Sequence, residues 1–297
     1  MKKILTYFLF IAVVLCGLNS CVETRETAQS LRDRFPGARL HALQDSDYEL
    51  GYMSIHRNDT FPTLFFIHGS PSNMSVYNAY YADTSLAKWA NIIAADRPGY
   101  GFSNSGKSEK SVRRQAKQMW NILEKEGYPS PLYIIGSSYG GTVATKMAMT
   151  KPDKVAGLVL VSASLAPGEE TTYDISYIIR HKFFRWLLPQ KIMVANDEKL
   201  SHIESLNEML PMWSKITAPV ILFQGTKDRL ILPENVNFAR LKLTKAKSIE
   251  YHMLENERHF LQIKYKNYIL ERLRALVKKN AESEKQLAGN ISLQFTE

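Results

Sequence analysis

The chain has 297 residues, of which 45% are hydrophobic and 23% are charged, and its formal net charge is +9 at pH 7. This composition is ordinary for a globular protein with a core, and the length fits one large α/β domain or two smaller ones. The basic residues form no arginine-rich helix and no run interleaved with aromatic residues. We therefore expect no nucleic-acid partner and interpret the charge as a mildly basic surface.

The first twenty residues are typical of a secretory signal peptide. Lys2 and Lys3 precede an apolar run, 4–18, which is shorter than the roughly 20 residues of a permanent transmembrane helix. The sequence Leu18-Asn19-Ser20-Cys21 resembles a bacterial lipoprotein processing site, with a small residue directly before the cysteine. The resemblance implies a signal peptide at 1–20, and plain secretion is the alternative.

The same resemblance implies that Cys21 is lipidated and becomes the first residue of the mature protein. The protein would then be anchored by lipid to a membrane of the bacterial cell envelope, on its periplasmic or surface face. Cleavage would remove the other cysteine, Cys16, so the folded domain would hold no free thiol and no disulfide. This excludes a cysteine enzyme and a cysteine-ligated zinc protein.

Apolar runs and helical patterns alternate along most of the remaining chain. Residues 21–45 are polar and are interpreted as a tether and entry segment. Strands are predicted at 48–56, 63–67, 91–95, 132–135, 155–161, 219–223 and 248–254, and helices at 75–90, 108–127, 139–150, 234–243 and 260–279. Such an alternation predicts a mostly parallel central sheet with helices on both faces, in which ligands gather at the carboxyl ends of the strands.

One segment, 164–211, is far longer than an ordinary connection between strands. We interpret it as a helical cap, inserted after the sixth strand of the fold, which divides the core into 46–163 and 212–280. Most of its apolar side chains would fill the cap's own small core, and one or two would face substrate. These side chains are Tyr173, Tyr177, Phe183, Phe184, Trp186, Met193 and Met209. The polar stretch 281–297 is expected to be a frayed tail.

Residues 136–140 read Gly-Ser-Ser-Tyr-Gly, a G-x-S-x-G motif between a predicted strand and a predicted helix. A serine on so sharp a turn is strained and exposed, and the two glycines leave room for the turn and for a substrate. Ser138 is therefore the candidate nucleophile. The alternative is a glycine-rich turn with a passive serine.

Other motifs lie at the ends of the other predicted strands. They are His68-Gly69-Ser70-Pro71, the run Asp96-Arg97-Pro98-Gly99-Tyr100-Gly101-Phe102-Ser103, Gly225-Thr226-Lys227-Asp228 and His259-Phe260. In their order and spacing, with the G-x-S-x-G motif, these residues resemble the α/β-hydrolase family over about residues 46 to 280. The resemblance implies the α/β-hydrolase fold and the chain order Ser, acid, His for a catalytic triad.

Ser138, Asp228 and His259 satisfy this order, and all three follow predicted strands that end at the same edge of the sheet. A serine hydroxyl needs a base within hydrogen-bond reach, and the base needs an orienting group. The rival bases are His68, His181, His202 and His252. The rival acid is Asp96, which belongs to a turn that we interpret as architectural, with Arg97 as its neighbour.

The oxyanion of the reaction needs fixed N–H donors, which backbone amides usually supply. We expect them to be the amides of Tyr139, at the start of the helix that follows Ser138, and of Ser70. The next residue, Pro71, cannot serve because it has no N–H. Haloalkane dehalogenases and epoxide hydrolases resemble this chain at His259-Phe260-Leu261-Gln262. They carry an aspartate as the nucleophile at the position of Ser138, in the sharp turn (the elbow) between strand and helix. Arg258 stands where relatives often carry glycine, and we expect it to point to solvent.

These observations predict a serine hydrolase that cleaves a small or medium carboxylic ester, or a related acyl bond, through an acyl-enzyme. No metal-ligand spacing and no dinucleotide fingerprint is present, so we expect neither a metal nor a cofactor. An aminopeptidase or amidase is a competing hypothesis, with Glu169, Glu170 or Glu204 as the group that would bind the substrate amine. A C–C bond hydrolase and a non-catalytic surface binding protein are two further hypotheses. Nothing in the sequence indicates an oligomeric state.

Overall fold

The computed structural model describes residues 28–181 and 188–294. The predicted signal peptide and Cys21 lie outside the described residues, as do Phe183, Phe184 and Trp186 of the predicted cap. The chain divides into two compact units, residues 1–36 and 37–297. The first unit contributes the helix α2 (Ala28–Arg34), and every other element below belongs to the second.

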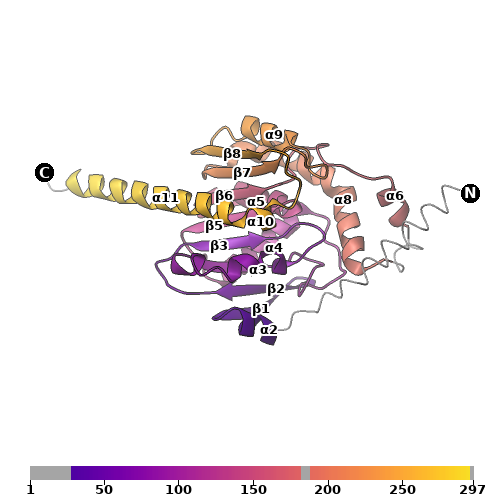
Figure 1. Ribbon diagram of the computed structural model, residues 1–297, viewed down its shortest axis with the longest axis horizontal. Helices are drawn as coiled ribbons and strands as arrows, with labels where there is room; N and C mark the ends of the chain where they lie inside the picture. Colours follow the sequence, from indigo (N-terminus) through magenta and orange to yellow (C-terminus); the bar gives the residue numbers. More distant parts are fainter. Residues whose placement is uncertain (1–27, 182–187, 295–297) are drawn as a thin grey trace, which may run out of the picture. The chain divides into compact units, whose positions relative to one another are not determined.

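An eight-stranded sheet forms the centre of the second unit (Figure 1). The strand order is β1-β2-β4-β3-β5-β6-β7-β8, in which β1 and β2 pair antiparallel, β2 pairs antiparallel with β4, and all the later pairs are parallel. The strands are β1 (Ala38–Asp45), β2 (Tyr48–Ile55), β3 (Thr63–Ile67), β4 (Asn91–Ala95), β5 (Leu132–Ser137), β6 (Gly157–Val161), β7 (Val220–Gly225) and β8 (Ile249–Leu254). The predicted fold class is confirmed.

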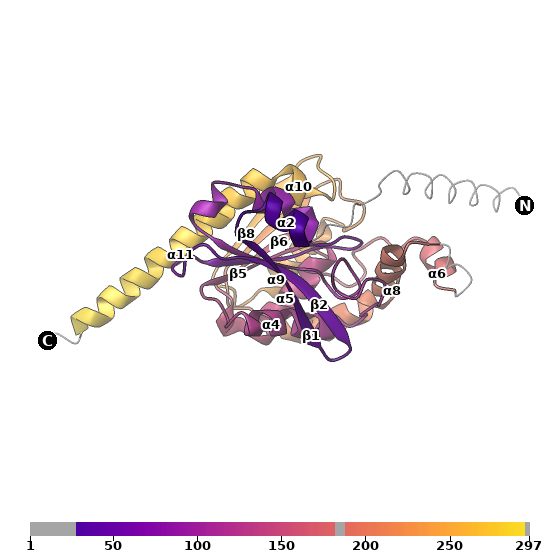
Figure 2. The ribbon, with the colours of Figure 1, turned by 90° about the horizontal axis from the view of Figure 1, so that it is seen from below.

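Helices cover both faces of this sheet, which explains why its central strands are mostly apolar. All residues of β3, β4 and β6 are buried, as expected for parallel strands covered on both sides. Figure 2 shows α4 and α5 on one face and α10 and α11 on the other. The bounds of the covering helices are α4 (Val112–Lys125), α5 (Tyr139–Thr150), α9 (Glu234–Lys242), α10 (Leu261–Lys264) and α11 (Lys266–Gln294).

The sequence of α4 shows why such a helix forms and docks. The side chain of Ser111 caps its amino end by accepting a hydrogen bond from the N–H of Arg114 at 3.3 Å. Val112, Met119 and Leu123 recur at helical spacing, and all are buried in the main core cluster. Because this apolar face meets the sheet, α4 is stabilised chiefly by packing.

The prediction of one continuous helix at 75–90 is wrong. The structure has three short helices there, η1 (Met74–Tyr77), α3 (Asn78–Tyr81) and η2 (Leu86–Lys88). The carboxylate of Asp83 accepts hydrogen bonds from the N–H groups of Ser85 at 2.9 Å and Leu86 at 3.0 Å. These bonds form a local turn that replaces the helical hydrogen bonds after α3.

The two ends of the predicted core also need correction. Strand β1 lies inside 21–45, the range expected to be a tether, and pairs with β2 over its whole length. It is an edge strand whose buried and exposed residues do not form a continuous apolar run, so its sequence looked polar. At the other end, α11 continues to Gln294, through most of the stretch that was expected to be a frayed tail.

A helical segment follows β6, where the cap was predicted. It contains α6 (Ile175–Ile179), α8 (Gln190–Met209) and the 3₁₀ helix η4 (Leu210–Lys215). In Figure 1, α6 and α8 lie beyond one end of the strands, and α11 runs past the other end. Among the described residues, no helix has the length and apolar character to span a membrane.

Candidate active site

Ser138 occupies the sharp turn between β5 and α5. Its backbone has φ 53° and ψ −127°, and it is the residue directly before the first residue of the helix. A Cβ at Gly140 would lie 2.3 Å from the carbonyl oxygen of His68, and one at Gly136 would lie 2.5 Å from the carbonyl oxygen of Gly140. Neither glycine can therefore carry a side chain in this turn, which lifts Ser138 out of the sheet edge.

His259 and Asp228 form a buried pair on the loops after β8 and β7. The ring nitrogen Nδ1 of His259 lies 2.8 Å from Oδ2 of Asp228, and His259 and Asp228 are 8% and 3% exposed. Asp228 also accepts hydrogen bonds through Oδ1 from the backbone N–H groups of Leu230 at 2.9 Å and Ile231 at 3.1 Å. These bonds fix the carboxylate, which in turn orients the imidazole ring.

Ser138 and His259 line the same cavity, whose volume is about 300 Å³. No hydrogen bond joins the hydroxyl of Ser138 to the ring of His259 in the part of the chain that the structure describes. Such bonds are often long in the absence of substrate and tighten in the reacting complex. The structure thus brings Ser138, His259 and Asp228 to one sheet edge, as the sequence predicted.

Ser70 and Tyr139, the expected oxyanion donors, line this cavity as well. Tyr139 is the first residue of α5, so its backbone N–H has no acceptor within the helix. The neighbouring Gly69 packs directly against the elbow, since a Cβ there would lie 2.8 Å from Cβ of Ser138. No hydrogen bond within the described residues occupies the backbone N–H of Ser70 or Tyr139, so both remain available to a ligand.

A buried ion pair, which no sequence motif indicates, lies behind the loop that carries Gly69 and Ser70. Arg97 and Glu198 are 2.5 Å apart from Nη1 to Oε1, and both side chains are 0% exposed. Burial alone would lower the pKa of Arg97, but Glu198 raises it above its ordinary value. Arg97 also donates from Nε to the carbonyl of His68 at 2.9 Å and from Nη2 to that of Gly69 at 3.2 Å.

Glu198 belongs to the cap helix α8 and reaches the loop that carries Gly69 and Ser70, which we call the oxyanion loop because Ser70 is a predicted oxyanion donor. Its Oε2 accepts hydrogen bonds from the hydroxyls of Ser70 at 2.6 Å and Tyr100 at 2.7 Å. Its Oε1 accepts one from Nε2 of Gln115 at 2.9 Å. Nothing in the sequence of α8 distinguishes this glutamate from its neighbours, because its partners lie about one hundred residues earlier in the chain.

A second acidic residue, Glu170, lines the catalytic cavity but already has charged partners. Its Oε1 lies 2.7 Å from Nζ of Lys199, and its Oε2 lies 3.0 Å from Nδ1 of His202. Oε2 also accepts a hydrogen bond from Ser164 at 2.8 Å. Burial alone would raise the pKa of Glu170, but His202 and Lys199 together lower it to about 2. The carboxylate is therefore charged and compensated within the protein.

The rival residues of the turn motifs have structural partners. Asp96 accepts hydrogen bonds from the backbone N–H groups of Met74 and Phe102, each at 2.7 Å, so it is architectural as expected. His68 is fully buried and accepts a hydrogen bond from the N–H of Arg97 at 2.9 Å. Burial, together with Arg97, holds the pKa of His68 well below its ordinary value, so its ring is neutral and shapes the loop.

The other rival histidines lie outside the cavity that Ser138 lines, so none of them is placed to act as its base. His252 lies within β8 and bonds to Glu250 at 2.6 Å, and His202 bonds to Glu170. Neither they nor the exposed His181 lines the catalytic cavity. Arg258, beside His259, is exposed, as the sequence analysis expected.

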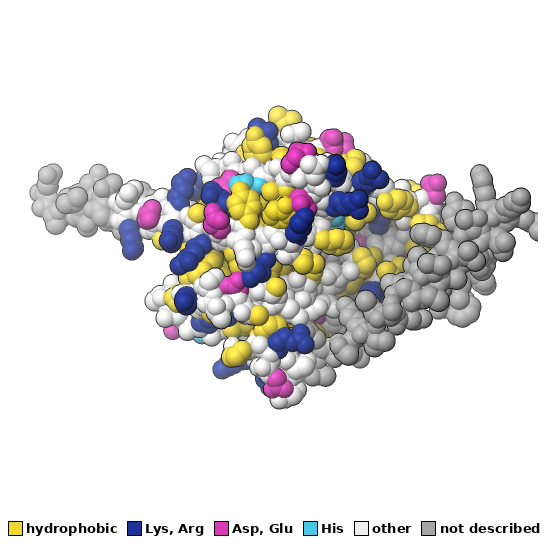
Figure 3. Space-filling model, viewed as in Figure 1, with side chains coloured by type: hydrophobic (Ala, Val, Ile, Leu, Met, Phe, Trp, Pro, Cys, Tyr) yellow, Lys and Arg dark blue, Asp and Glu magenta, His cyan; other side chains and the backbone are white. Residues whose placement is uncertain are grey.

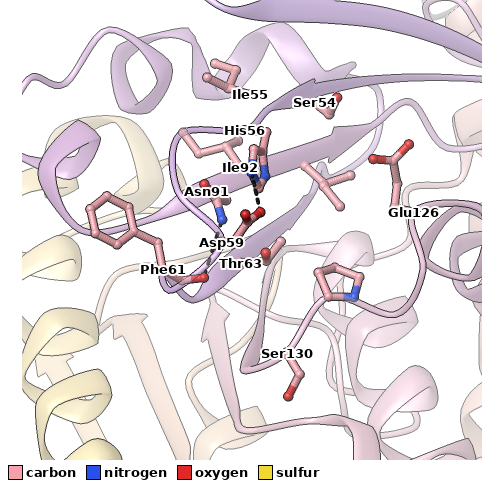
Figure 4. A pocket seen from close by; sticks show the side chains of 12 residues that line it. Ser54, Ile55, His56, Asp59, Phe61, Thr63, Asn91, Ile92, Glu126 and Ser130 are labelled. Carbon is pink, nitrogen blue, oxygen red and sulfur yellow. Dashed lines mark hydrogen bonds and ion pairs between the residues drawn. The ribbon is translucent and has the colours of Figure 1, made fainter.

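Another cavity, of about 240 Å³, lies at the opposite edge of the sheet (Figure 4). Its wall includes Thr63 and Asn91, which are the first residues of β3 and β4. Figure 4 shows His56 and Asp59 paired with each other there, without a serine directed at the histidine. This cavity thus lacks the arrangement found at Ser138. Among the described residues, no group of three or more His, Cys, Asp or Glu could hold a metal ion.

Comparison with known proteins agrees with this fold. The α/β-hydrolase fold profile matches residues 62–190. A bacterial membrane phospholipase A shares the architecture with a TM-score of 0.65 at 20% identity, covering 95% of this chain and 99% of that one. A proposed lipase of Acinetobacter baumannii shares it with a TM-score of 0.66 at 20% identity, over 86% of this chain and 96% of that one. The chain has the α/β-hydrolase fold.

Curated relatives of this α/β-hydrolase-fold chain act on acyl compounds, as their names state. The mitochondrial palmitoyl-protein thioesterase ABHD10 of Mus musculus is 27% identical over 183 residues, covering 57% of this chain and 60% of the relative. The monoacylglycerol lipase ABHD6 of Homo sapiens is 26% identical over 231 residues, covering 74% and 64%. The chain therefore spans less than two thirds of the length of these relatives.

Proposed function

We propose that this protein is a serine hydrolase that cleaves a small or medium carboxylic ester, or a related acyl bond, through an acyl-enzyme. The observation that carries the proposal is the placement of Ser138 on a strained elbow in the same cavity as the His259–Asp228 pair. A nucleophile that a substrate can reach, a base and an orienting acid are the parts that acyl transfer by serine requires.

The geometry supports an ordinary two-step reaction. His259 takes the proton of the Ser138 hydroxyl through Nε2 as the oxygen attacks the acyl carbon, and Asp228 stabilises the resulting imidazolium through Nδ1. The N–H groups of Ser70 and Tyr139 would meet the tetrahedral oxyanion. His259 then protonates the leaving alcohol, and a water molecule activated by the same ring hydrolyses the acyl-enzyme.

The cavity favours an apolar acyl group of modest size. Apolar side chains form much of its wall, and its volume of about 300 Å³ is at the lower end for ligand pockets. The apolar residues are Pro71, Ile179, Ile192, Ala195, Leu230 and Ile231. The thioesterase and the lipase among the relatives act on acyl groups, which supports the same substrate class here.

An aminopeptidase is not favoured, although Glu170 does line the cavity. A substrate amine would have to displace Lys199, whose ammonium group already occupies Oε1 of Glu170. Glu204 is exposed and lies outside the cavity, and so does Glu169. The hypotheses of a C–C bond hydrolase and of a non-catalytic binding protein are separated from an esterase by the assay below.

We also propose that the protein is a bacterial lipoprotein, anchored through Cys21 to a membrane of the cell envelope. The support is the sequence of the first 21 residues, in which a basic and an apolar segment precede a small residue and a cysteine. An enzyme held at a membrane would meet acyl substrates that are themselves apolar.

Labelling with a fluorophosphonate tests the proposed reaction, because this probe phosphonylates an activated serine. We expect the wild-type protein to be labelled and to hydrolyse p-nitrophenyl butyrate. Ser138→Ala and His259→Ala should lose the label and lower kcat by about 10³-fold or more, since the residues of such a triad act as one unit. Ser176→Ala is the matched control, because Ser176 lines the same cavity without contacting the triad.

Two outcomes would contradict the proposal. A folded wild-type protein that is neither labelled nor active on esters would favour a binding protein on the same scaffold. A labelled protein that cleaves a carbon–carbon bond beside a ketone, but no ester, would favour the C–C bond hydrolase.

A further inference from the structure

We infer that Glu198 of the cap helix α8 is a positioning residue, which orients the backbone N–H of Ser70 toward the reacting carbonyl. The inference rests on the proposed function, because it assigns a support to the oxyanion donor of that reaction. It adds a role for the cap: the cap holds part of the catalytic machinery of the core in place, besides covering it.

The carboxylate of Glu198 is fully buried and is held by donors from three segments of the core. Arg97 donates to both of its oxygens, at 2.5 and 3.2 Å, and Gln115 to one of them at 2.9 Å. Tyr100 and Ser70 donate to Oε2 at 2.7 and 2.6 Å. A buried charge with so many partners has one stable position, so the groups bound to it are fixed as well.

The first consequence concerns the peptide that joins Gly69 to Ser70. Nη2 of Arg97 donates to the carbonyl oxygen of Gly69 at 3.2 Å, and this oxygen also lies 2.7 Å from Nδ1 of His68. The peptide is trans, so its C=O and N–H point in opposite directions. Because Arg97 and His68 hold the carbonyl, the N–H of Ser70 is directed away from them.

The second consequence concerns the side chain of Ser70. Its hydroxyl is held by Glu198 and lies 2.5 Å from the hydroxyl of Tyr100, so Ser70 is fixed through its side chain as well as through its peptide. An oxyanion donor is effective only within a few tenths of an ångström of its required position. Arg97 pairs with the negative charge of Glu198, which would otherwise oppose the charge that develops on the substrate.

Kinetics of two single variants and their combination test this role. Glu198→Gln should lower kcat on p-nitrophenyl butyrate about 10- to 100-fold with KM unchanged within about threefold, because the loss of a whole donor costs about 100- to 1000-fold. Ser70→Ala keeps the Arg97–Glu198 pair and should lower kcat about 10-fold. The double variant should be within about threefold of Glu198→Gln, because both changes weaken the same charge-assisted contact.

Asp197, the preceding residue of α8, provides the matched control. Its Oδ2 accepts a hydrogen bond from Ser108 at 2.7 Å, so it too joins the cap to the core. Asp197→Asn should therefore keep kcat within about threefold of wild type. If it lowers kcat as much as Glu198→Gln does, cap attachment in general explains the effect and the inference fails.

The affinity for a trifluoromethyl ketone separates the two roles, because the loss of a merely structural residue would not change it. The hydroxyl of Ser138 adds to this ketone and forms an oxyanion, so its inhibition constant should rise in Glu198→Gln and Ser70→Ala in parallel with the loss of kcat. The corresponding alcohol, which forms no oxyanion, should bind all variants alike.

Undiminished kcat in Ser70→Ala would overturn the inference, as would losses that multiply in the double variant. If Glu198→Gln does not fold, as judged by circular dichroism, Ser70→Ala and the inhibitor still decide. An inactive wild-type protein would instead refute the proposed function, and the inference would fall with it.

Discussion

At the scale of single residues, Gly69 packs against Ser138 so closely that a side chain there would not fit. Gly69 lies so near Ser138 that an added Cβ would be 2.8 Å from Cβ of the serine and 3.5 Å from its Oγ. It would also lie 3.2 Å from the carbonyl oxygen of Ser137, so no flexible side chain could simply move aside. Space for the oxyanion loop beside Ser138 therefore depends on the absence of a side chain at position 69.

We predict that Gly69→Ala damages catalysis far more than it damages folding. The methyl group would push the oxyanion loop away from the elbow, and a shift of one ångström at a reacting centre can cost about 100-fold in rate. We expect kcat/KM on p-nitrophenyl butyrate to fall by about that factor, with a small change in the thermal midpoint.

Gly127→Ala is the control for this prediction. Gly127 has φ +76° and nothing within 4 Å of an added Cβ, so alanine there adds backbone strain of about 1 kcal/mol without touching the site. It should lower the thermal midpoint and leave kcat/KM unchanged. Equal losses of activity in the two variants would show that Gly69 acts through stability alone.

Prediction of single residues was most informative where a motif is required by the path of the backbone. The elbow serine and the histidine–aspartate pair are found where strand ends and family order placed them, although their catalytic roles stay a prediction. Glu198 could not be found in this way. Its importance depends on the fold bringing α8 against Arg97 and Ser70, and no local pattern in the sequence records that contact.

At the scale of elements, a second group of polar contacts holds the cap helix α8 in place. Lys199 and His202 lie on α8, whereas Glu170 and Ser164 lie on the segment between β6 and α6. Nε2 of His202 lies 3.2 Å from the hydroxyl of Thr142 in α5. The cap helix is thus fixed at two neighbouring points, one centred on Glu170 and the other on Glu198.

The contact at Glu170 predicts acid sensitivity. The pKa of this carboxyl is lowered from 4.5 to about 2, so its stabilising effect is complete above pH 4.5 and is lost as the pH falls toward 2. Between pH 5 and pH 3 the carboxyl of Glu170 takes up a proton in the unfolded chain but not in the folded one, and we expect this to remove about 2 kcal/mol of the free energy of unfolding. Urea titrations at the two pH values should show a smaller loss for Glu170→Gln than for wild type.

Glu204→Gln is the comparison for that measurement, because Glu204 is an exposed carboxylate on the same helix. Its loss of stability between the two pH values should equal that of the wild-type protein. If Glu170→Gln also behaves like wild type, the carboxyl does not gain stability from His202 and Lys199.

Elements were predictable where a buried strand or a strongly periodic helix forms, and less so elsewhere. The start and end of α5 agree with the sequence prediction, because a glycine-bound elbow begins the helix and an apolar face continues it. The short helices between β3 and β4 were predicted as one long helix, since the turn made by Asp83 leaves the apolar pattern unchanged.

At the scale of the whole molecule, basic and apolar side chains share the surface near the site. Figure 3 shows Lys and Arg side chains among hydrophobic ones near the loops that follow β7 and β8. Lys227, Arg229 and Arg258 belong to these loops and are exposed, as are Leu230 and Phe260. Such a surface would suit the membrane-anchored enzyme that we propose, because anionic lipid headgroups attract basic side chains.

Removal of the proposed anchor should change where the protein is found. We predict that Cys21→Ser, expressed in a bacterium, moves the protein from the membrane pellet to the soluble fraction, because one polypeptide without lipid lacks the acyl chains that hold it. Cys16→Ser is the matched control and should remain in the pellet. A Cys21→Ser protein that stays with the membrane would refute lipidation at this residue.

The position of β8 in the sheet has a consequence for how activity begins and ends. β8 pairs with β7 and forms the outer edge, and His259 is carried on the loop directly after it. If His259 is the base, as we propose, the protein cannot turn over substrate until β8 has docked against β7. Edge strands also open before central ones. Local unfolding of β8 would therefore abolish activity while the central strands are still folded.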